Sequence, residues 1–232
     1  MTQTLRIMPR EMRLMSERIL SLTALPKGFA LMVQDVVMYS EKMGFGGFAH
    51  LEKRLPELLE ADPAKIRITR EGEGEIALDA GGQHAWFVVP SLIDLLVEGV
   101  VADGTARVEI FNIADPAELG IASGLGGRAG ISVECRIGKN SMVMASKAAT
   151  VSDPVLQAAL EDGCMIEADQ WWRIYHLAQT ALTPDSVVSR RHAGPLIVTE
   201  DGKVIGRTDN DDDTDISFLS NVAKSETSEA AR

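Results

Sequence analysis

Side chains that could bind and transform a small anion gather near the C-terminus of the chain. They comprise two hydroxyls, two adjacent guanidinium groups and an imidazole: Ser186, Ser189, Arg190, Arg191 and His192. A planar guanidinium donates paired hydrogen bonds to a carboxylate, so we expect Arg190 to hold the anion while the serines hydrogen-bond it. Neighbouring cations lower the pKa of an imidazole, which makes His192 the predicted general base.

Two acidic residues, Asp209 and Asp211, follow a predicted hairpin shortly after this segment. They either fold back onto Arg190, where Asp209 would orient a neighbouring catalytic group, or they stay solvated. The acidic run around them lacks the glycine and the closing glutamate of an EF-hand loop, so we predict no metal site. A Ca²⁺-binding acidic tail remains a further hypothesis.

A glycine-rich stretch over residues 124–130 resembles a phosphate-binding loop. The dinucleotide fingerprint needs a strand before the loop and a helix after it, whereas here a strand follows. We therefore predict no dinucleotide site and no cofactor. A plain turn is the favoured interpretation, and a loop that closes over an anion through Arg128 is the alternative.

The elements that must position these groups change in type along the chain. Apolar residues first recur at helical spacing and then, from Lys65, at the two-residue spacing of strands. Prolines mark helix starts at Pro9, Pro26, Pro90 and Pro154, and a run from Trp86 to Val89 is predicted as a strand. A stripe from Leu5 to Ile19 faces either the core, which we favour, or a partner protein.

These patterns predict an α+β protein with N-terminal helices packed on a mainly antiparallel sheet. We expect a single domain over residues 1–219 and a disordered acidic tail over 220–232. The domain would comprise a helical part (1–62), two ββαβ-like halves (65–112 and 130–168), and a C-terminal helix with a polar segment (169–219).

Composition narrows the classes of partner. The chain carries 34 acidic and 23 basic residues, a net charge of −11, which disfavours nucleic acid and anionic membranes. The longest apolar run, Ala85 to Val101, is interrupted by Pro90, Asp94 and Glu98, so we predict no membrane span. The first residues lack the apolar core of a signal peptide, and two cysteines form no CxxC motif. We therefore expect a cytoplasmic protein.

Two regions resemble an uncharacterised family of small proteobacterial proteins, a domain of unknown function. The first runs from Pro26 through Gly44 and Gly47 to Leu51. The second contains Pro-x-Ser-x-x-Ser-Arg from Pro184, then Ala-Gly, then Thr-Asp-Asn-Asp at 208–211, although here residues 195–207 separate the last two parts. The resemblance implies no established activity.

The sequence favours a metabolic enzyme or enzyme subunit acting on a small polar metabolite that bears a carboxylate, with hydrolysis or elimination as the guessed reaction. The alternative is a non-catalytic binding or assembly subunit. In that case the Leu5–Ile19 stripe and the helix with Trp171 and Trp172 would hold a partner or a second copy of the chain.

Overall fold

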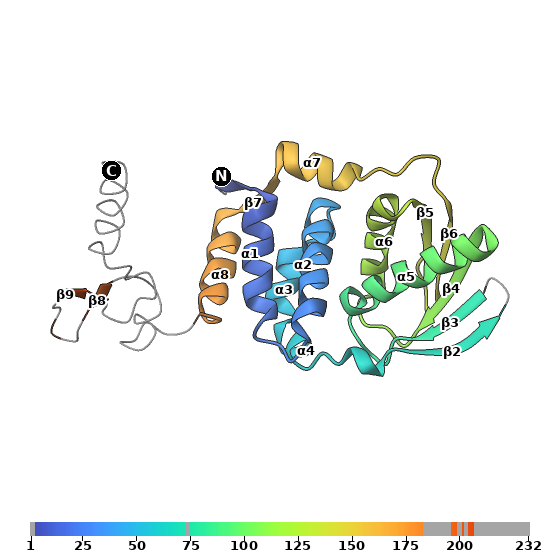
Figure 1. Ribbon diagram of the computed structural model, residues 1–232, viewed down its shortest axis with the longest axis horizontal. Helices are drawn as coiled ribbons and strands as arrows, with labels where there is room; N and C mark the ends of the chain where they lie inside the picture. The colour runs from blue at the N-terminus through green and yellow to red at the C-terminus, as the bar shows by residue number, and fades with distance from the viewer. Residues whose placement is uncertain (1–2, 73–74, 183–195, 199–200, 202–203, 207–232) are drawn as a thin grey trace, which may run out of the picture. The chain divides into compact units, whose positions relative to one another are not determined.

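The computed structural model describes residues 3–72, 75–182, 196–198, 201 and 204–206 (Figure 1). The chain divides into two compact units, Met1–Leu182 and Thr183–Arg232. Within the second unit, β8 (Leu196–Val198) and β9 (Val204–Gly206) form an antiparallel hairpin, as the sequence predicts. All other elements belong to the first unit.

Four helices open the first unit after a short strand. They are α1 (Pro9–Leu20), α2 (Lys27–Lys42), α3 (Gly47–Lys53) and α4 (Leu55–Leu59). Pro9 occupies the first turn of α1 and Pro56 the first turn of α4, where a missing N–H removes no helical hydrogen bond. Met12, Met15 and Ile19 are buried in the core, which confirms the favoured interpretation of the apolar stripe.

A five-stranded sheet forms the other half of the unit. Its strands are β2 (Arg67–Gly72), β3 (Glu75–Asp79), β4 (Thr105–Phe111), β5 (Ile131–Arg136) and β6 (Ser141–Lys147), in the order β2-β3-β4-β6-β5. The pair β3–β4 is parallel and the other three pairs are antiparallel. The prediction of helices packed on a mainly antiparallel sheet is therefore confirmed.

Helix α5 (Ala85–Asp103) connects the two parallel strands, and it corrects one prediction. The run from Trp86 to Val89 is the start of this helix and not a strand, and Pro90 lies inside it. These residues are buried on every side, so their apolar run has no period that separates a strand from a helix. By length and composition α5 could cross a membrane, but in this unit it is the central core helix.

The glycine-rich stretch is also helical. A short η2 (Pro116–Gly120) leads into α6 (Ile121–Gly126) and η3 (Gly127–Ala129), so the predicted plain turn is wrong. A Cβ on Gly124 would meet Tyr39 and Val155, and one on Gly126 would meet Val133. The glycines therefore let α6 pack closely against its neighbours.

Five further elements complete the unit. They are η1 (Pro63–Lys65), α7 (Pro154–Asp162), β7 (Cys164–Glu167), α8 (Ala168–Gln179) and β1 (Thr4–Ile7). The stretch 65–112 has the predicted order β2-β3-α5-β4, and 130–168 has the order β5-β6-α7-β7. However, β7 leaves the large sheet and pairs with β1 in a separate two-stranded sheet.

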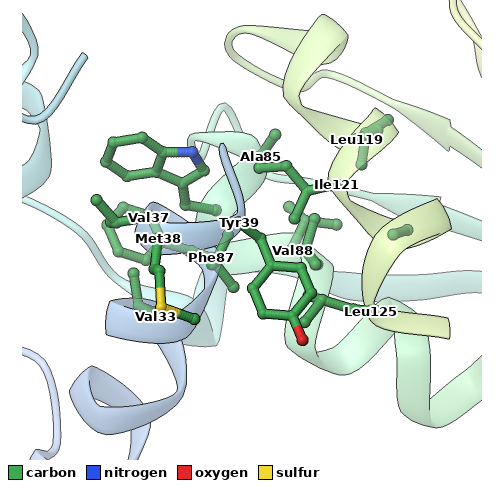
Figure 2. Packing of buried hydrophobic residues seen from close by; sticks show 14 of the residues in the cluster. Val33, Val37, Met38, Tyr39, Ala85, Phe87, Val88, Leu119, Ile121 and Leu125 are labelled. Atoms are coloured by element: carbon green, nitrogen blue, oxygen red, sulfur yellow. The ribbon is translucent and has the colours of Figure 1, made fainter. Parts of the chain in front are cut away.

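The core fills the space between the N-terminal helices and the sheet. Figure 1 shows α5 and α6 between the sheet and α2. Val33, Val37 and Tyr39 of α2 face Phe87 and Val88 of α5 in the close view of Figure 2. The start of α5 is therefore fixed from both sides, which matters because a candidate site lies there.

Candidate functional site

Most of the residues predicted to form the site lie outside the part of the chain that the structure describes. These are Ser186, Ser189, Arg190, Arg191, His192 and Asp209. Their proposed convergence therefore stays a prediction. Arg128 is described, and its Nη1 lies 3.1 Å from Asp35 Oδ2 while its guanidinium stacks 5.6 Å from the centre of the Tyr39 ring. Arg128 thus already has protein partners.

The structure brings together a different set of polar groups. His50, His84 and Asp115 approach one another so closely that a ligand atom from each lies within 4.8 Å of the others. Arg54 and Glu118 border this group, and we call these five residues the histidine cluster. Sequence reasoning missed it because the two histidines are far apart in the chain and belong to no known spacing motif.

Two members of the cluster follow the parallel strands. The segments that leave β3 and β4 run side by side, since Ala85 N donates to Ala114 O at 3.0 Å and Ala114 N donates to Gln83 O at 3.0 Å. This pairing sets His84, at the start of α5, beside Asp115, just before η2. The carboxyl ends of parallel strands are the usual place for ligand sites in open sheets.

The backbone at Asp115 is in an unfavourable conformation. Its φ of 49° and ψ of 59° place it in the left-handed region, and Pro116 follows directly. A residue before proline strongly prefers an extended backbone, so this conformation must be held by its surroundings. Its side chain is held by Arg54, whose Nη2 donates to Asp115 Oδ1 at 2.8 Å. Such strain is typical of functional positions.

His50 is carried by the short helix α3. Gly46, with a φ of 82°, turns the chain into the helix, and Glu41 accepts a hydrogen bond from Phe48 N at 2.9 Å at its start. A Cβ on Gly47 would overlap the carbonyl oxygen of Val37, so α3 lies directly against the backbone of α2. The imidazole of His50 is thereby placed over the beginning of α5, with its ring centre 6.3 Å from that of His84.

His84 is a buried, neutral imidazole. Burial is the main cause that lowers its pKa to about 4, and the nearby Asp115 carboxylate opposes this effect only in part. Its Nδ1 accepts a hydrogen bond from Trp86 N at 3.2 Å and so caps α5. A neutral imidazole that accepts at Nδ1 carries its proton on Nε2. That Nε2 lies 3.2 Å from Asp115 Oδ2, so the two atoms attract each other although their alignment is poor for a hydrogen bond.

This tautomer argues against a metal ion in the cluster. A metal binds a lone pair, and the lone pair of His84 is on Nδ1 and faces Trp86 N. Ligation through Nε2 would need the proton on Nδ1, where it would point at the N–H of Trp86 and break that hydrogen bond. The guanidinium of Arg54 also already pairs its positive charge with the Asp115 carboxylate, which would have to ligate the ion. The donor set therefore fits a divalent cation poorly.

Unpartnered polar atoms concentrate in the cluster. Among the described residues, five buried side-chain atoms lack a hydrogen-bond partner, and four of them are here: His50 Nδ1, Arg54 Nε, His84 Nε2 and Asp115 Oδ2. Buried polar atoms in folded proteins nearly always have partners, so such a concentration calls for an explanation. The side chains of His50, Arg54 and Asp115 are also 29%, 34% and 21% exposed, so the cluster lies near the surface although these four atoms are buried.

Comparisons with known proteins give only distant similarities. No protein-family model matches the chain, and no curated protein matches it. Among solved structures it is similar to malate dehydrogenase from Entamoeba histolytica, with 17% identity over 56% of this chain and 38% of that enzyme, and a TM-score of 0.46. A dehydrogenase from Sinorhizobium meliloti shares 15% identity over 77% of this chain and 71% of that one, with a TM-score of 0.48.

Sulfolactate dehydrogenase from Methanocaldococcus jannaschii shares 14% identity over 60% of this chain and 47% of that enzyme, with a TM-score of 0.45. This chain thus spans less than half the length of the amoebic and the methanogen enzymes. At these identities and TM-scores, the likeness carries no conclusion about what this chain does.

Proposed function

We propose that the protein is an enzyme or enzyme subunit that binds a small hydroxy-carboxylate in the histidine cluster and exchanges a proton with it through His50. The observation that supports this most strongly is the convergence of four buried polar atoms that form no hydrogen bond among the described residues, although two of them, His84 Nε2 and Asp115 Oδ2, lie 3.2 Å apart. A ligand that complements these atoms removes the penalty of leaving them unpaired.

The type of each atom defines the ligand. Arg54 Nε and His84 Nε2 are donors, because the first is a guanidinium nitrogen and the second carries the imidazole proton. Two such donors suit a carboxylate group. Asp115 Oδ2 is an acceptor, and His50 Nδ1 can also accept, so a hydroxyl on the same ligand would complete the set.

The cluster suits acid–base chemistry. His50 is an imidazole whose Nδ1 has no hydrogen-bond partner among the described residues, so this nitrogen is free to accept a proton, as a general base must. The chemistry we propose is proton exchange at the hydroxyl, because the unpartnered Nδ1 of His50 can accept a proton.

Calorimetric titration of the full-length protein tests the proposal. Three ligands are compared: a three- or four-carbon hydroxy acid, the matching acid without the hydroxyl, and zinc chloride. We expect the hydroxy acid to bind and the deoxy acid to bind about tenfold more weakly, because one hydrogen bond is lost. Tight zinc binding that His50→Gln removes, with neither acid bound, would replace the proposal with a metal site.

A further inference from the structure

We propose that Glu118 is a positioning residue that holds His50 in the tautomer with its proton on Nε2, so that Nδ1 is the proton acceptor of the cluster. The inference deepens the proposed function and rests on it for the identity of the group that donates to Nδ1. The tautomer itself is a property of the ligand-free protein, so it can be measured independently.

Glu118 is a buried carboxylate with a fixed orientation. It is 2% exposed and lies in η2, the short helix that begins directly after the cluster residue Asp115. Its Oε2 accepts two hydrogen bonds, from Trp86 Nε1 at 2.8 Å and from Ser40 Oγ at 2.7 Å. Buried carboxylates are retained where hydrogen bonds and a charge partner compensate their desolvation.

The second oxygen faces the imidazole. With Oε2 engaged twice, Oε1 is turned toward His50, and it lies 3.6 Å from His50 Nε2. The distance exceeds that of a hydrogen bond, so the contact is an electrostatic attraction between the carboxylate and an N–H dipole. A carboxylate oxygen is an acceptor only, and therefore it favours a proton on the nitrogen that faces it.

Four other groups surround His50, and among them the Asp115 carboxylate is already bound by Arg54. They are the neutral ring of His84 at the start of α5, the Trp86 ring at 6.4 Å between centres, the Arg54 guanidinium that follows α3, and the Asp115 carboxylate held by Arg54. Nδ1 has no hydrogen-bond partner among the described residues. With the proton on Nε2, that nitrogen presents a lone pair to the cluster.

Replacing Glu118 by glutamine should reverse the tautomer. An indole N–H can only donate, so Trp86 keeps the amide oxygen of the glutamine at the present Oε2 position. The amide NH₂ then takes the Oε1 position and points at His50 Nε2 as a donor. The imidazole can meet it only by accepting at Nε2, which moves the proton to Nδ1.

Glu41→Gln is the matched control. Glu41 is a neighbouring carboxylate of α2 that accepts a hydrogen bond from Phe48 N at 2.9 Å. A glutamine can keep that bond through its amide oxygen. The variant therefore removes the same charge from the same region and leaves the pair of Glu118 and His50 intact.

Long-range ¹H–¹⁵N spectra of the full-length, histidine-labelled protein at pH 7.5 read the tautomer directly, with His50→Gln used for assignment. We expect the Nε2–H form in the wild type and in Glu41→Gln, and the Nδ1–H form in Glu118→Gln. A wild-type spectrum with the proton on Nδ1, or no change in a folded Glu118→Gln, would overturn the inference. If Glu118→Gln does not fold, a wild-type spectrum with the proton on Nδ1 still overturns the inference.

Ligand binding separates this inference from the proposed function. Glu118→Gln should weaken the hydroxy acid about tenfold while leaving the deoxy acid within twofold, because only the hydroxyl needs an acceptor at Nδ1. Equal weakening of both acids would contradict the role of Glu118. If the wild type has the Nε2–H form but binds neither acid, the proposed function fails while the tautomer assignment stands.

Discussion

Arg54 has a divided role in the histidine cluster. Its Nη2 is fixed on Asp115 Oδ1 at 2.8 Å, whereas its Nε is buried without a partner among the described residues. The first contact holds a strained acidic residue in place, and the second atom is available to a ligand. A lysine at this position would keep the charge but lose the planar set of donors.

Arg54→Lys should therefore weaken hydroxy-acid binding by roughly 10- to 100-fold, the range expected when a hydrogen bond to a charged group is lost. Arg70→Lys is the matched control, because Arg70 pairs with Glu109 at 3.3 Å on the sheet and is exposed. Calorimetric titration of both variants gives the dissociation constants. Similar affinities in the two variants would remove Arg54 from the binding site.

His84 predicts a pH dependence of stability. Its pKa falls from the ordinary 6.5 to about 4 on folding, so the unfolded chain binds this proton more readily than the folded one. The stabilisation is fully present above pH 6.5 and is lost as the pH falls toward 4, by an amount on the order of 3 kcal/mol.

Urea unfolding between pH 7 and pH 4.5 measures this effect. His84→Asn keeps an oxygen that can cap α5 at Trp86 N but removes the titrating imidazole. The wild type should lose more of its free energy of unfolding than the variant over this range. Parallel pH profiles would show that the His84 imidazole is not buried as a neutral group.

Among the elements, α3 determines where His50 lies. The helix is short and depends on contact with α2, since a Cβ on Gly47 would overlap the backbone carbonyl of Val37. Gly28 lies in α2, and a Cβ added to it would have no atom within 4 Å. Close packing of α3 on α2 therefore requires a glycine at position 47, whereas nothing in the packing requires one at position 28.

Gly47→Ala should lower the free energy of unfolding by roughly 1–3 kcal/mol through overpacking and should also weaken ligand binding by displacing α3. Gly28→Ala should raise stability by about 0.4–1 kcal/mol, because alanine restricts the unfolded chain. Chemical denaturation of both variants provides the comparison. A Gly47→Ala protein as stable as the wild type would mean that α3 does not pack this tightly.

Local signals in the sequence predict elements better than they predict the site. Prolines at Pro9 and Pro154 mark true helix starts because a proline at the first turn has a purely local cause. The run from Trp86 to Val89 was predicted as a strand and is helical, because residues buried on every side show no periodicity that separates the two. The histidine cluster depends on the parallel pairing of β3 with β4 and on the docking of α3, and neither contact leaves a local pattern.

At the scale of the whole molecule, the first unit contains every member of the histidine cluster. Its two ends are joined by the pairing of β1 with β7, which places Thr4 opposite Glu167. The strand pair that joins the beginning and the end of the unit therefore lies entirely within Met1–Leu182. The alternative site, around Ser189, Arg190 and His192, belongs to the second unit and lies outside the described residues.

A chain that ends at Leu182 separates the two sites. We expect it to unfold cooperatively and to bind the hydroxy acid within about threefold of the full-length protein, since all five residues of the cluster belong to the unit Met1–Leu182. Arg190→Ala in the full-length chain should likewise leave binding unchanged. Loss of binding in both proteins would favour the C-terminal site that the sequence predicts.

The most direct test of the account is a titration of full-length, histidine-labelled protein with a short hydroxy acid, followed by side-chain NMR. We predict that the imidazole signals of His50 and His84 shift together and saturate at one dissociation constant, while the signals of His176 on α8 stay unchanged. Binding that shifts neither His50 nor His84 would contradict the claim that the ligand enters the histidine cluster.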